Sequence, residues 1–229
     1  MKSDLTGIKG WVFDVDDTVY LERDYVRSGF HAVGDYIETV TGNAYFGETC
    51  WQLFQSGVRG DVFNKALSGL QIRSHATSVS KLVDVYRFHK PVIFCQESTI
   101  EALMKLRVHY EISIITGGPE ESQRRKVLAL GLDSLFTNVI YSGRYGPALD
   151  KPHPWAWKEI ENRTGLHGCD LIYVGDNPSK DFNAPLELGW RTLRVRQKNS
   201  LHEALPTPSD VPECRTLIEG ITSMMGDLS

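Results

Sequence analysis

Closely spaced cysteine pairs are absent from this chain. Its cysteines are Cys50, Cys95, Cys169 and Cys214, and no two of them are closer than 45 positions. Zinc-binding cysteines usually stand about two to four residues apart, so the spacing argues against a cysteine zinc site. A chain of 229 residues also has no need of a disulfide framework. We therefore expect four reduced, buried thiols, as in a cytosolic protein.

Long apolar runs and a strong charge of either sign are also absent. No run approaches the about 20 apolar residues of a membrane helix, and residues 1–9 contain no apolar signal core, so we expect a cytoplasmic protein. Lys and Arg number 25 against 29 Asp and Glu, giving a net charge of −4. This charge gives no electrostatic reason to expect nucleic acid or an anionic membrane as partner. A single positive site could still bind a small anion.

The chain is about one and a half times as long as a typical domain of about 150 residues. Hydrophobic residues make up 41% and charged residues 24%, which is typical of a soluble globular protein and excludes collagen, coiled coil and wholesale disorder. No internal repeat or low-complexity tract is present. The length therefore predicts either one domain with a large insertion or two modest domains. It does not predict the oligomeric state.

Three short apolar runs predict buried parallel strands, at residues 10–14, 112–116 and 171–174. Weaker strand patterns cover residues 139–142 and 192–195.

Helical patterns alternate with these runs at residues 120–130, 154–163 and 180–188. This alternation predicts an α/β fold, a Rossmann-like, doubly wound parallel sheet with helices on both faces.

The stretch at residues 24–97 breaks this alternation. It contains helical patterns at residues 25–40, 46–55 and 79–89 and no convincing strand. We therefore expect an α/β core domain made of residues 1–23 and 98–229, with an α-helical domain inserted at residues 24–97. The final segment, residues 197–229, contains a loop and a last helical pattern at residues 214–224, and the sequence suggests no function for it.

Acidic residues follow two of the predicted strands. Asp14, Asp16 and Asp17 lie within four residues, and Asp176 and Asp181 follow the strand at residues 171–174. Ligands of open α/β sheets bind beyond the carboxyl ends of the strands, where these groups would converge. Taken alone, an acidic turn fits a helix cap or a solvated loop equally well. Clustered carboxylates, however, raise one another's pKa unless a cation is present, and oxygen-only ligands favour magnesium.

Four motifs in order make the chain resemble the haloacid dehalogenase-like (HAD) hydrolase superfamily. The first is FDVDDT at residues 13–18, and the second is the apolar run that ends in Thr116. The third is Lys151, in the segment DKPHP, and the fourth is the Gly-Asp pair at residues 175–176 with Asp181 five residues beyond. Each motif alone is weak, but four in the expected order and strand context are highly specific.

The resemblance implies a phosphatase mechanism. Asp14 would be the nucleophile that forms an aspartyl-phosphate, and Asp16 would donate and then accept a proton. Asp14, the backbone carbonyl of Asp16, and Asp176 would hold Mg²⁺. The remaining implied residues bind the phosphoryl group or support the site: Thr116, the Gly117 amide and Lys151 would bind phosphoryl oxygens, and Asp181 would orient Lys151 or a metal-bound water.

Three of these residues have simpler interpretations. Thr116 could be a helix N-cap, Lys151 a solvated loop lysine, and Asp181 a carboxylate that stabilises the first turn of the next helix. The joint occurrence of the motifs favours the functional interpretation of Thr116 and Lys151. For Asp181 the two interpretations remain open.

Within the superfamily, Asp16 favours a phosphomonoester phosphatase over a dehalogenase, because dehalogenases resemble this chain but lack the second aspartate. A phosphomutase keeps both aspartates and remains an alternative, as does a catalytically inactive binding protein on this fold. A phospho-accepting receiver also combines clustered Asp with a Thr and a Lys. It is a single small domain without the insertion, and it is the least favoured.

The insertion lies between the first and second motifs, where one subgroup of the superfamily carries a helical cap. The separation in sequence between Asp14 and Thr116 is 102 residues, whereas the separation between Thr116 and Lys151 is only 35. A cap that closes over the site excludes water and favours a small soluble substrate. Sugar phosphates, nucleoside monophosphates and short phosphorylated acids fit equally well. Candidate specificity residues are Arg23, Tyr25, Arg27, Trp51, Gln55, Arg59 and Arg73.

Overall fold

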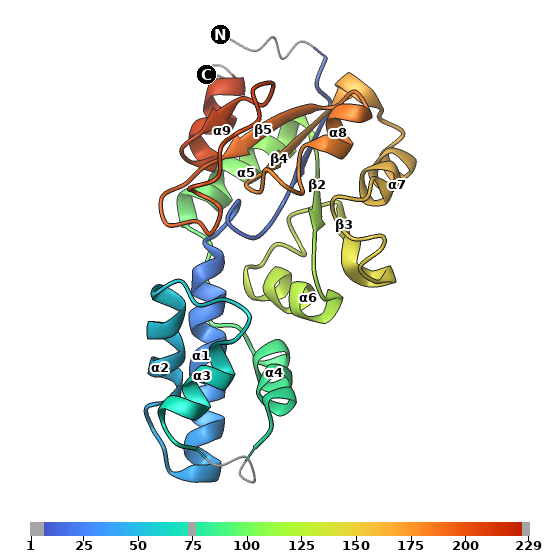
Figure 1. Cartoon of the computed structure of the whole chain (residues 1–229). Helices are drawn as coiled ribbons and strands as arrows, with labels where there is room; N and C mark the ends of the chain where they lie inside the picture. Colours follow the sequence, from blue (N-terminus) through green and yellow to red (C-terminus); the bar gives the residue numbers. More distant parts are fainter. Residues whose placement is uncertain (1–6, 73–76, 226–229) are drawn as a thin grey trace. The chain divides into compact units, whose positions relative to one another are not determined.

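The computed structural model describes residues 7–72 and 77–225. The chain divides into two compact units, one formed by both ends of the chain and the other by Asp24–Ile93. The described part of the first unit covers residues 7–23 and 94–225. Figure 1 colours the chain along its length, and the second unit is the group of helices drawn in blue to green.

A six-stranded sheet forms the centre of the first unit, with the order β3-β2-β1-β4-β5-β6. Every neighbouring pair of strands is parallel. The strands are β1 (Gly10–Phe13), β2 (Glu111–Thr116), β3 (Asn138–Tyr141), β4 (Leu171–Gly175), β5 (Arg191–Val195) and β6 (Glu213–Cys214). The predicted α/β class is therefore confirmed. β1 lies between β2 and β4, with Trp11 opposite both Ile112 and Ile172.

Alternating side chains of these strands point to opposite faces of the sheet. Val12 and Ile115 belong to a buried cluster on the face covered by α7 (Trp155–Thr164), which contributes Trp157. Side chains at the alternate strand positions, such as Val174 in β4, point to the opposite face of the sheet. That face is covered by α5 (Glu97–His109) and α9 (Leu217–Met225), which pack against each other. The sheet is thus covered on both sides by helices, as Figure 1 shows.

Two further helices follow the strands near the carboxyl edge of the sheet. They are α6 (Glu120–Ala129), after β2, and α8 (Asn183–Glu187), after β4. The helix expected at residues 180–188 is therefore shorter, because residues 180 and 181 lie in the turn before it. The expected helix at residues 214–224 begins only at Leu217, since Cys214 pairs with β5 as part of β6.

The second unit is helical throughout its described part apart from the connecting turns. It consists of α1 (Glu22–Thr41), which begins in the first unit, α2 (Phe46–Gln55), α3 (Val62–Gly69) and α4 (Val79–Phe88). Its core is rich in aromatic rings, with Phe30 in contact with Phe54, Phe63 and Tyr86. A Cβ on Gly47 would lie 2.7 Å from the backbone oxygen of Phe30, so glycine allows α1 and α2 to approach closely.

Two helices were not expected from the sequence. α3 spans only 8 residues, and Ala66 is its one buried residue. α5 carries exposed Met104 and Val108, which obscure its buried side. Among residues 7–72 and 77–225, no helix combines the length and the apolar character that crossing a bilayer requires.

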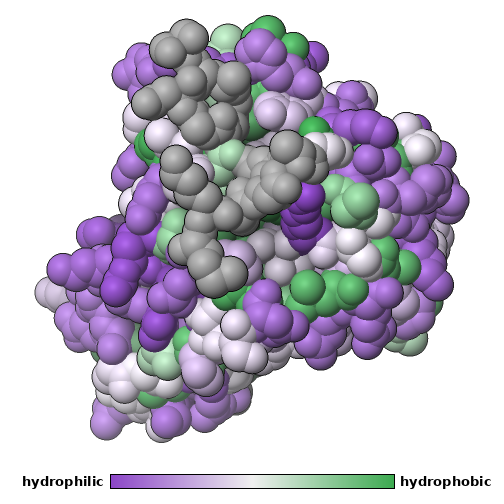
Figure 2. All heavy atoms as spheres, turned by 90° about the horizontal axis from the view of Figure 1, so that it is seen from above, coloured by the Kyte–Doolittle hydropathy of each residue, from purple (hydrophilic) through white to green (hydrophobic). Residues whose placement is uncertain are grey.

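All four cysteines are free thiols, as expected. The expectation that all are buried is wrong for Cys169, which is exposed in the short helical turn Gly168–Asp170, and for Cys95, which is half-buried. On the face drawn in Figure 2, polar residues predominate and apolar residues occur in small separate groups. Such a distribution is ordinary for a surface in contact with water.

Candidate active site

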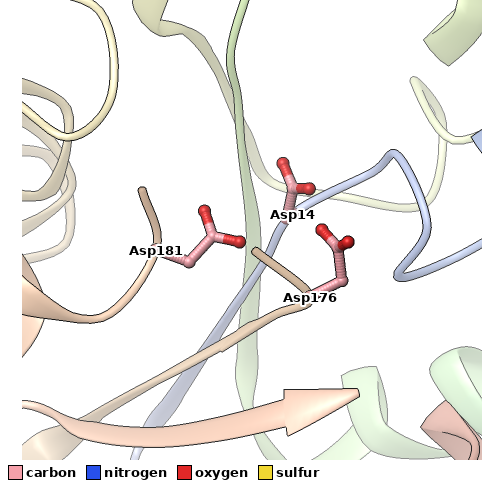
Figure 3. Close-up of side chains that lie close together, drawn as sticks. All are labelled: Asp14, Asp176 and Asp181. Atoms are coloured by element: carbon pink, nitrogen blue, oxygen red, sulfur yellow. The ribbon is translucent and has the colours of Figure 1, made fainter. Parts of the chain in front are cut away.

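Buried acidic side chains meet at the carboxyl edge of the sheet. Asp14 directly follows β1 and Asp176 directly follows β4, and these two strands are neighbours. Asp181 lies in the turn before α8. One carboxylate oxygen of each of the three residues lies within 4.8 Å of the others. Figure 3 shows the three carboxylates directed toward a common region.

Lys151 joins this cluster from the loop after β3. Its Nζ donates hydrogen bonds of 2.7 Å to Asp14 Oδ1 and 2.8 Å to Asp181 Oδ1, and it lies 3.1 Å from the hydroxyl of Tyr173. The side chain of Lys151 is only 5% exposed. The interpretation of Lys151 as a solvated loop lysine is therefore wrong.

Asp150 fixes the loop that carries Lys151. Its carboxylate accepts hydrogen bonds from the backbone N–H groups of Gly118 and Lys151, at 2.9 and 2.8 Å, and from the hydroxyl of Ser142. The turn after β2 and the loop after β3 are thus tied together. A Cβ on Gly117 would lie 3.2 Å from Cε of Lys151, so this turn lies directly against the lysine.

Burial dominates the electrostatics of this cluster. It raises the pKa of Asp14 to about 7, although Lys151 acts in the opposite direction. Burial also raises the pKa of Asp176 to about 10, and the charges of Asp181 and Asp14 add to this effect. Burial would lower the pKa of Lys151, but the charges of Asp14 and Asp181 outweigh it and raise this pKa well above its usual value. One ammonium thus faces three carboxylates.

The cluster fits a divalent cation. Oδ2 of Asp176 is buried and accepts no hydrogen bond from the described residues. A buried carboxylate oxygen without a partner is unfavourable, and a cation would stabilise it. The available groups are all oxygens, which favours a hard cation such as Mg²⁺ over a transition metal. Asp14 and Asp176 are the two residues of this cluster that were predicted from the sequence to bind the metal. Asp181 lies close enough to them to be a further ligand.

The carboxylate of Asp16 points toward α6 and is not part of this cluster. Its two oxygens accept hydrogen bonds from Lys126 Nζ, at 2.7 and 2.8 Å, from Gln123 Nε2, at 2.9 Å, and from the hydroxyl of Tyr20, at 2.5 Å. Burial alone would raise the pKa of Asp16, but the charge and hydrogen bonds of Lys126, together with the hydrogen bonds from Tyr20 and Gln123, hold this pKa below its ordinary value. Any contribution of Asp16 to the metal site would have to come from its backbone carbonyl.

Thr116 is fully buried at the end of β2. Its hydroxyl donates a 2.8 Å hydrogen bond to Gln123 Oε1, and the N-cap position of α6 is Pro119. The interpretation of Thr116 as a helix N-cap is therefore wrong. Asp181 contacts Lys151 through one oxygen, and its other oxygen accepts the backbone N–H of Asn177 at 2.9 Å.

Sequence reasoning missed the residues that support the motifs from outside them. Gln123 and Lys126 were placed in a helix, and their spacing of three put them on one side of it, but nothing in the sequence indicated that this side was buried. The C-terminal segment, for which no function was expected, contacts the first motif. Gln197 donates to the backbone oxygen of Asp17, and the backbone N–H of Leu201 donates to its carboxylate.

Several of the candidate specificity residues make contacts within the helical unit. The guanidinium of Arg27 lies 5.5 Å from the ring centre of Trp51, and that of Arg59 lies 3.9 Å from the ring centre of Phe54. Tyr25 is buried against Tyr86. Arg73 lies outside the described residues.

Residues 8–189 match the family model described as haloacid dehalogenase-like hydrolase. The chain belongs to this hydrolase family. The family predicted from the four motifs is thereby confirmed, and the match includes every motif residue named above.

Curated relatives of the chain are phosphatases. It is 29% identical to the glyceraldehyde 3-phosphate phosphatase of Methanocaldococcus jannaschii, over 82% of this chain and 85% of that protein. It is 28% identical to the protein of the same name from Methanopyrus kandleri, over 90% of this chain and 91% of the relative.

Solved structures support the fold. A putative HAD-hydrolase from Bacillus subtilis, described as bound to magnesium, superposes with a TM-score of 0.67 at 17% identity. The superposition covers 95% of this chain and 98% of that one. Solved dehalogenases share the fold as well. The fold alone therefore does not select the reaction.

Proposed function

We propose that this protein is a Mg²⁺-dependent phosphatase that hydrolyses a small phosphorylated metabolite through an aspartyl-phosphate on Asp14. The observation that carries the proposal is the pairing of Asp14 with Lys151 beside Asp176, whose buried Oδ2 has no partner among the described residues. A nucleophile, a fixed positive charge and an oxygen-only cation site thus occur together. The names of the curated relatives support a phosphomonoester as substrate.

Asp14 and Asp176, with the backbone carbonyl of Asp16, would hold the magnesium ion. Asp181 would orient Lys151, which it contacts at 2.8 Å, or a water bound to the metal. When bound, the ion supplies positive charge that lets an anionic phosphate approach an anionic nucleophile.

In the first step, a carboxylate oxygen of Asp14 forms a bond to phosphorus while the bond from phosphorus to the leaving oxygen breaks. Asp16 gives its proton to that leaving oxygen, so the product departs as a neutral alcohol. Lys151, Thr116 and the amide of Gly117 would bind the phosphoryl oxygens and stabilise their charge.

In the second step, Asp16 accepts a proton from water, and the water oxygen attacks phosphorus. The bond between phosphorus and Asp14 breaks, which releases inorganic phosphate and restores both aspartates. The two steps require Asp16 to begin protonated and to end protonated, so this one side chain serves as acid and then as base. The ion pair with Lys126 favours the ionised form of Asp16, so Asp16 has to take up a proton before the first step.

Asp16 is also the residue that favours a phosphatase over a dehalogenase. An alkoxide leaving group is a strong base and needs a proton, whereas a halide leaves without one. Asp16, two residues from Asp14, is half-buried and accepts hydrogen bonds from three side chains of the same unit.

The substrate class follows from the helical insertion. We propose that the unit Asp24–Ile93 is a cap that excludes water from the site and contributes specificity residues. Such a cap suits sugar phosphates, nucleoside monophosphates or short phosphorylated acids. A phosphoprotein would be too large to be enclosed.

The test is release of inorganic phosphate from a panel of phosphorylated metabolites and from an aryl phosphate, with and without Mg²⁺. Asp14→Asn should lower Mg²⁺-dependent hydrolysis at least about 10³-fold, because it removes the nucleophile without changing the size of the side chain. Asp210→Asn changes an exposed acid of the same unit and serves as the matched control.

Both variants should give the circular dichroism spectrum of the wild type. The proposal is wrong if the wild type releases no phosphate from any ester in the presence of Mg²⁺. It is also wrong if Asp14→Asn, still folded, retains the activity of Asp210→Asn. Isomerised phosphate esters in place of free phosphate would indicate the phosphomutase alternative.

A further inference from the structure

A cavity of about 260 Å³ lies among the helices of the unit Asp24–Ile93. Its most buried walls are apolar and include Phe30 and Phe54, which are 5% and 7% exposed. Half-buried apolar residues of α3 and α4 complete much of the lining: Val62, Phe63, Val79, Val83 and Tyr86. A cavity of this size and character suits a small organic molecule.

Aromatic rings form a large part of the cavity wall. The ring centre of Phe30 lies 6.1 Å from that of Phe54, 6.0 Å from that of Phe63 and 5.7 Å from that of Tyr86. Phe63 and Tyr86 meet edge to face, and both remain half-buried. Apolar ring surface beside the cavity is therefore accessible to water, and an apolar ligand would cover it. An aromatic ligand would add favourable contacts between rings.

Arg59 is fixed at this cavity although its side chain is exposed. Its Nη1 donates hydrogen bonds of 2.6 Å to the backbone oxygen of Phe54 and 2.9 Å to that of Val58. The centre of its guanidinium lies 3.9 Å from the ring centre of Phe54. The backbone at the end of α2 and the stacked ring together hold the plane of the guanidinium, so less freedom is lost when a ligand binds it.

The hydrogen bonds of Arg59 leave one edge of its guanidinium available. Both bonds come from Nη1, and neither Nε nor Nη2 has an acceptor among the residues that the structure describes. These two nitrogens donate in parallel from the same edge, which is the geometry that binds both oxygens of a carboxylate. Among the described residues that line the cavity, Arg59 alone is charged. The cavity therefore combines one positive, forked donor with an apolar interior.

We propose that this cavity is a binding site for a small carboxylate with an apolar, aromatic body. The carboxylate pairs with Nε and Nη2 of Arg59, and the body of the ligand packs against Phe30, Phe63 and Tyr86. The inference does not rest on the proposed function, because all of its residues lie in one unit and its readout is binding. The same chemistry suits a separate metabolite or a part of the substrate, and the experiment distinguishes these two sources.

The experiment is calorimetric titration of the whole protein with phenylacetate and with 3-phenylpropionate. Phenylacetamide, which has the same body without the charge, and acetate, which has the charge without the ring, are the matched control probes. We expect at least one of the two aromatic acids to bind with a Kd of about 1 mM or tighter. Phenylacetamide and acetate should bind at least about 10-fold more weakly.

Two variants test the two parts of the site. Arg59→Met removes the forked donor and should raise the Kd of the aromatic acid at least about 10-fold. Val83→Phe fills the cavity from α4 and should weaken binding by a similar factor. Arg87→Met is the matched control, because it changes an exposed arginine of α4 that does not line the cavity, and the Kd should stay within about 2-fold of the wild type.

Arg59 is exposed, so Arg59→Met should keep the circular dichroism spectrum of the wild type, and it decides the test alone if Val83→Phe does not fold. The proposal is overturned if neither aromatic acid binds, or if phenylacetamide binds as tightly as the acids. It is also overturned if Arg59→Met binds the acids as the wild type does, since the acids then bind elsewhere on the protein.

The aromatic acid that binds more tightly is then added during hydrolysis of p-nitrophenyl phosphate. A higher KM at constant kcat would identify the site as one for a carboxylate-bearing part of the substrate, whereas unchanged kinetics would assign it to a separate ligand. A wild type that hydrolyses no phosphate ester would overturn the proposed function and leave the binding result in place. The two failures are therefore distinguishable.

Discussion

The guanidinium of Arg194 donates a 2.9 Å hydrogen bond from Nε to the backbone oxygen of Asp176. Arg194 lies in β5 and is fully buried. Its other nitrogens donate to the backbone oxygens of His202 and Leu205 and to the hydroxyl of Thr207. This one side chain therefore ties the acidic turn after β4 to the C-terminal segment.

Arg194→Met should lower the free energy of unfolding by about 2–4 kcal/mol, because it leaves several buried acceptors without their charged donor. It should also weaken Mg²⁺ binding, since the turn that carries Asp176 loses its support. Urea denaturation with and without Mg²⁺ measures both effects. Arg163→Met, which removes an exposed ion pair with Glu159, should change stability by less than about 0.5 kcal/mol. An Arg194 variant as stable as this control would contradict the prediction.

The raised pKa values of the acidic cluster predict how stability depends on pH without a cation. Burial raises the pKa of Asp14 to about 7 and that of Asp176 to about 10, both above the ordinary value of 3.8. The folded protein then holds protons that the unfolded chain has already lost. The contribution of Asp14 to stability is thus fully present below pH 3.8 and is lost as the pH rises through about 7. That of Asp176 is lost over a range that extends to about pH 10.

Mg²⁺ should reverse this loss, because it favours the ionised carboxylates. The increase in Tm caused by excess Mg²⁺ should therefore grow between about pH 5.5 and 8.5, and at 100 times the Kd it corresponds to about 2.7 kcal/mol. Thermal unfolding across this pH range measures it. Asp176→Asn should abolish the increase and raise the Tm of the cation-free protein at high pH. A Mg²⁺ effect that does not depend on pH would contradict the assignment of these ligands.

Gly143 lies against the turn after β2. A Cβ at this position would lie 2.0 Å from the backbone oxygen of Gly118, and backbone cannot rotate away as a side chain can. Gly143→Ala should therefore lower the free energy of unfolding by about 1–3 kcal/mol. It should also reduce activity, because Gly118 directly follows Thr116 and Gly117, which we propose bind the phosphoryl oxygens.

Gly69→Ala is the control for this substitution, since a Cβ there would meet no atom within 4 Å. It should leave stability unchanged or raise it by up to about 1 kcal/mol. Chemical denaturation of the two variants decides the comparison. Equal stabilities would show that the turn after β2 shifts freely.

The sheet and the acidic cluster could be predicted because their signals are local. An apolar run such as Ile112 to Thr116 predicts a buried strand, and the carboxyl ends of neighbouring parallel strands bring Asp14 and Asp176 together. The supporting residues could not be predicted in this way. Lys126 and Arg194 look like surface residues in sequence, and only the packing of α6 and β5 shows that they are buried.

The helical insertion illustrates the same limit. α2 was predicted with its observed bounds, whereas α3, which spans only 8 residues, was missed. The role of the C-terminal segment depends on contacts such as Leu201 with Asp17, which join positions 184 residues apart. No local pattern encodes a contact of that kind.

The position of β1 in the sheet has a consequence for synthesis of the protein. Both neighbours of β1 come much later in the chain, β2 at Glu111 and β4 at Leu171, so Trp11 and Phe13 leave the ribosome without strands to pair with. At about 5–20 residues per second, the wait for β2 is about 5–20 s. The contacts of Asp24–Ile93 lie mostly within that unit, so it can fold during the wait. β1 is therefore an apolar segment that stays unpaired while the helical unit is synthesised.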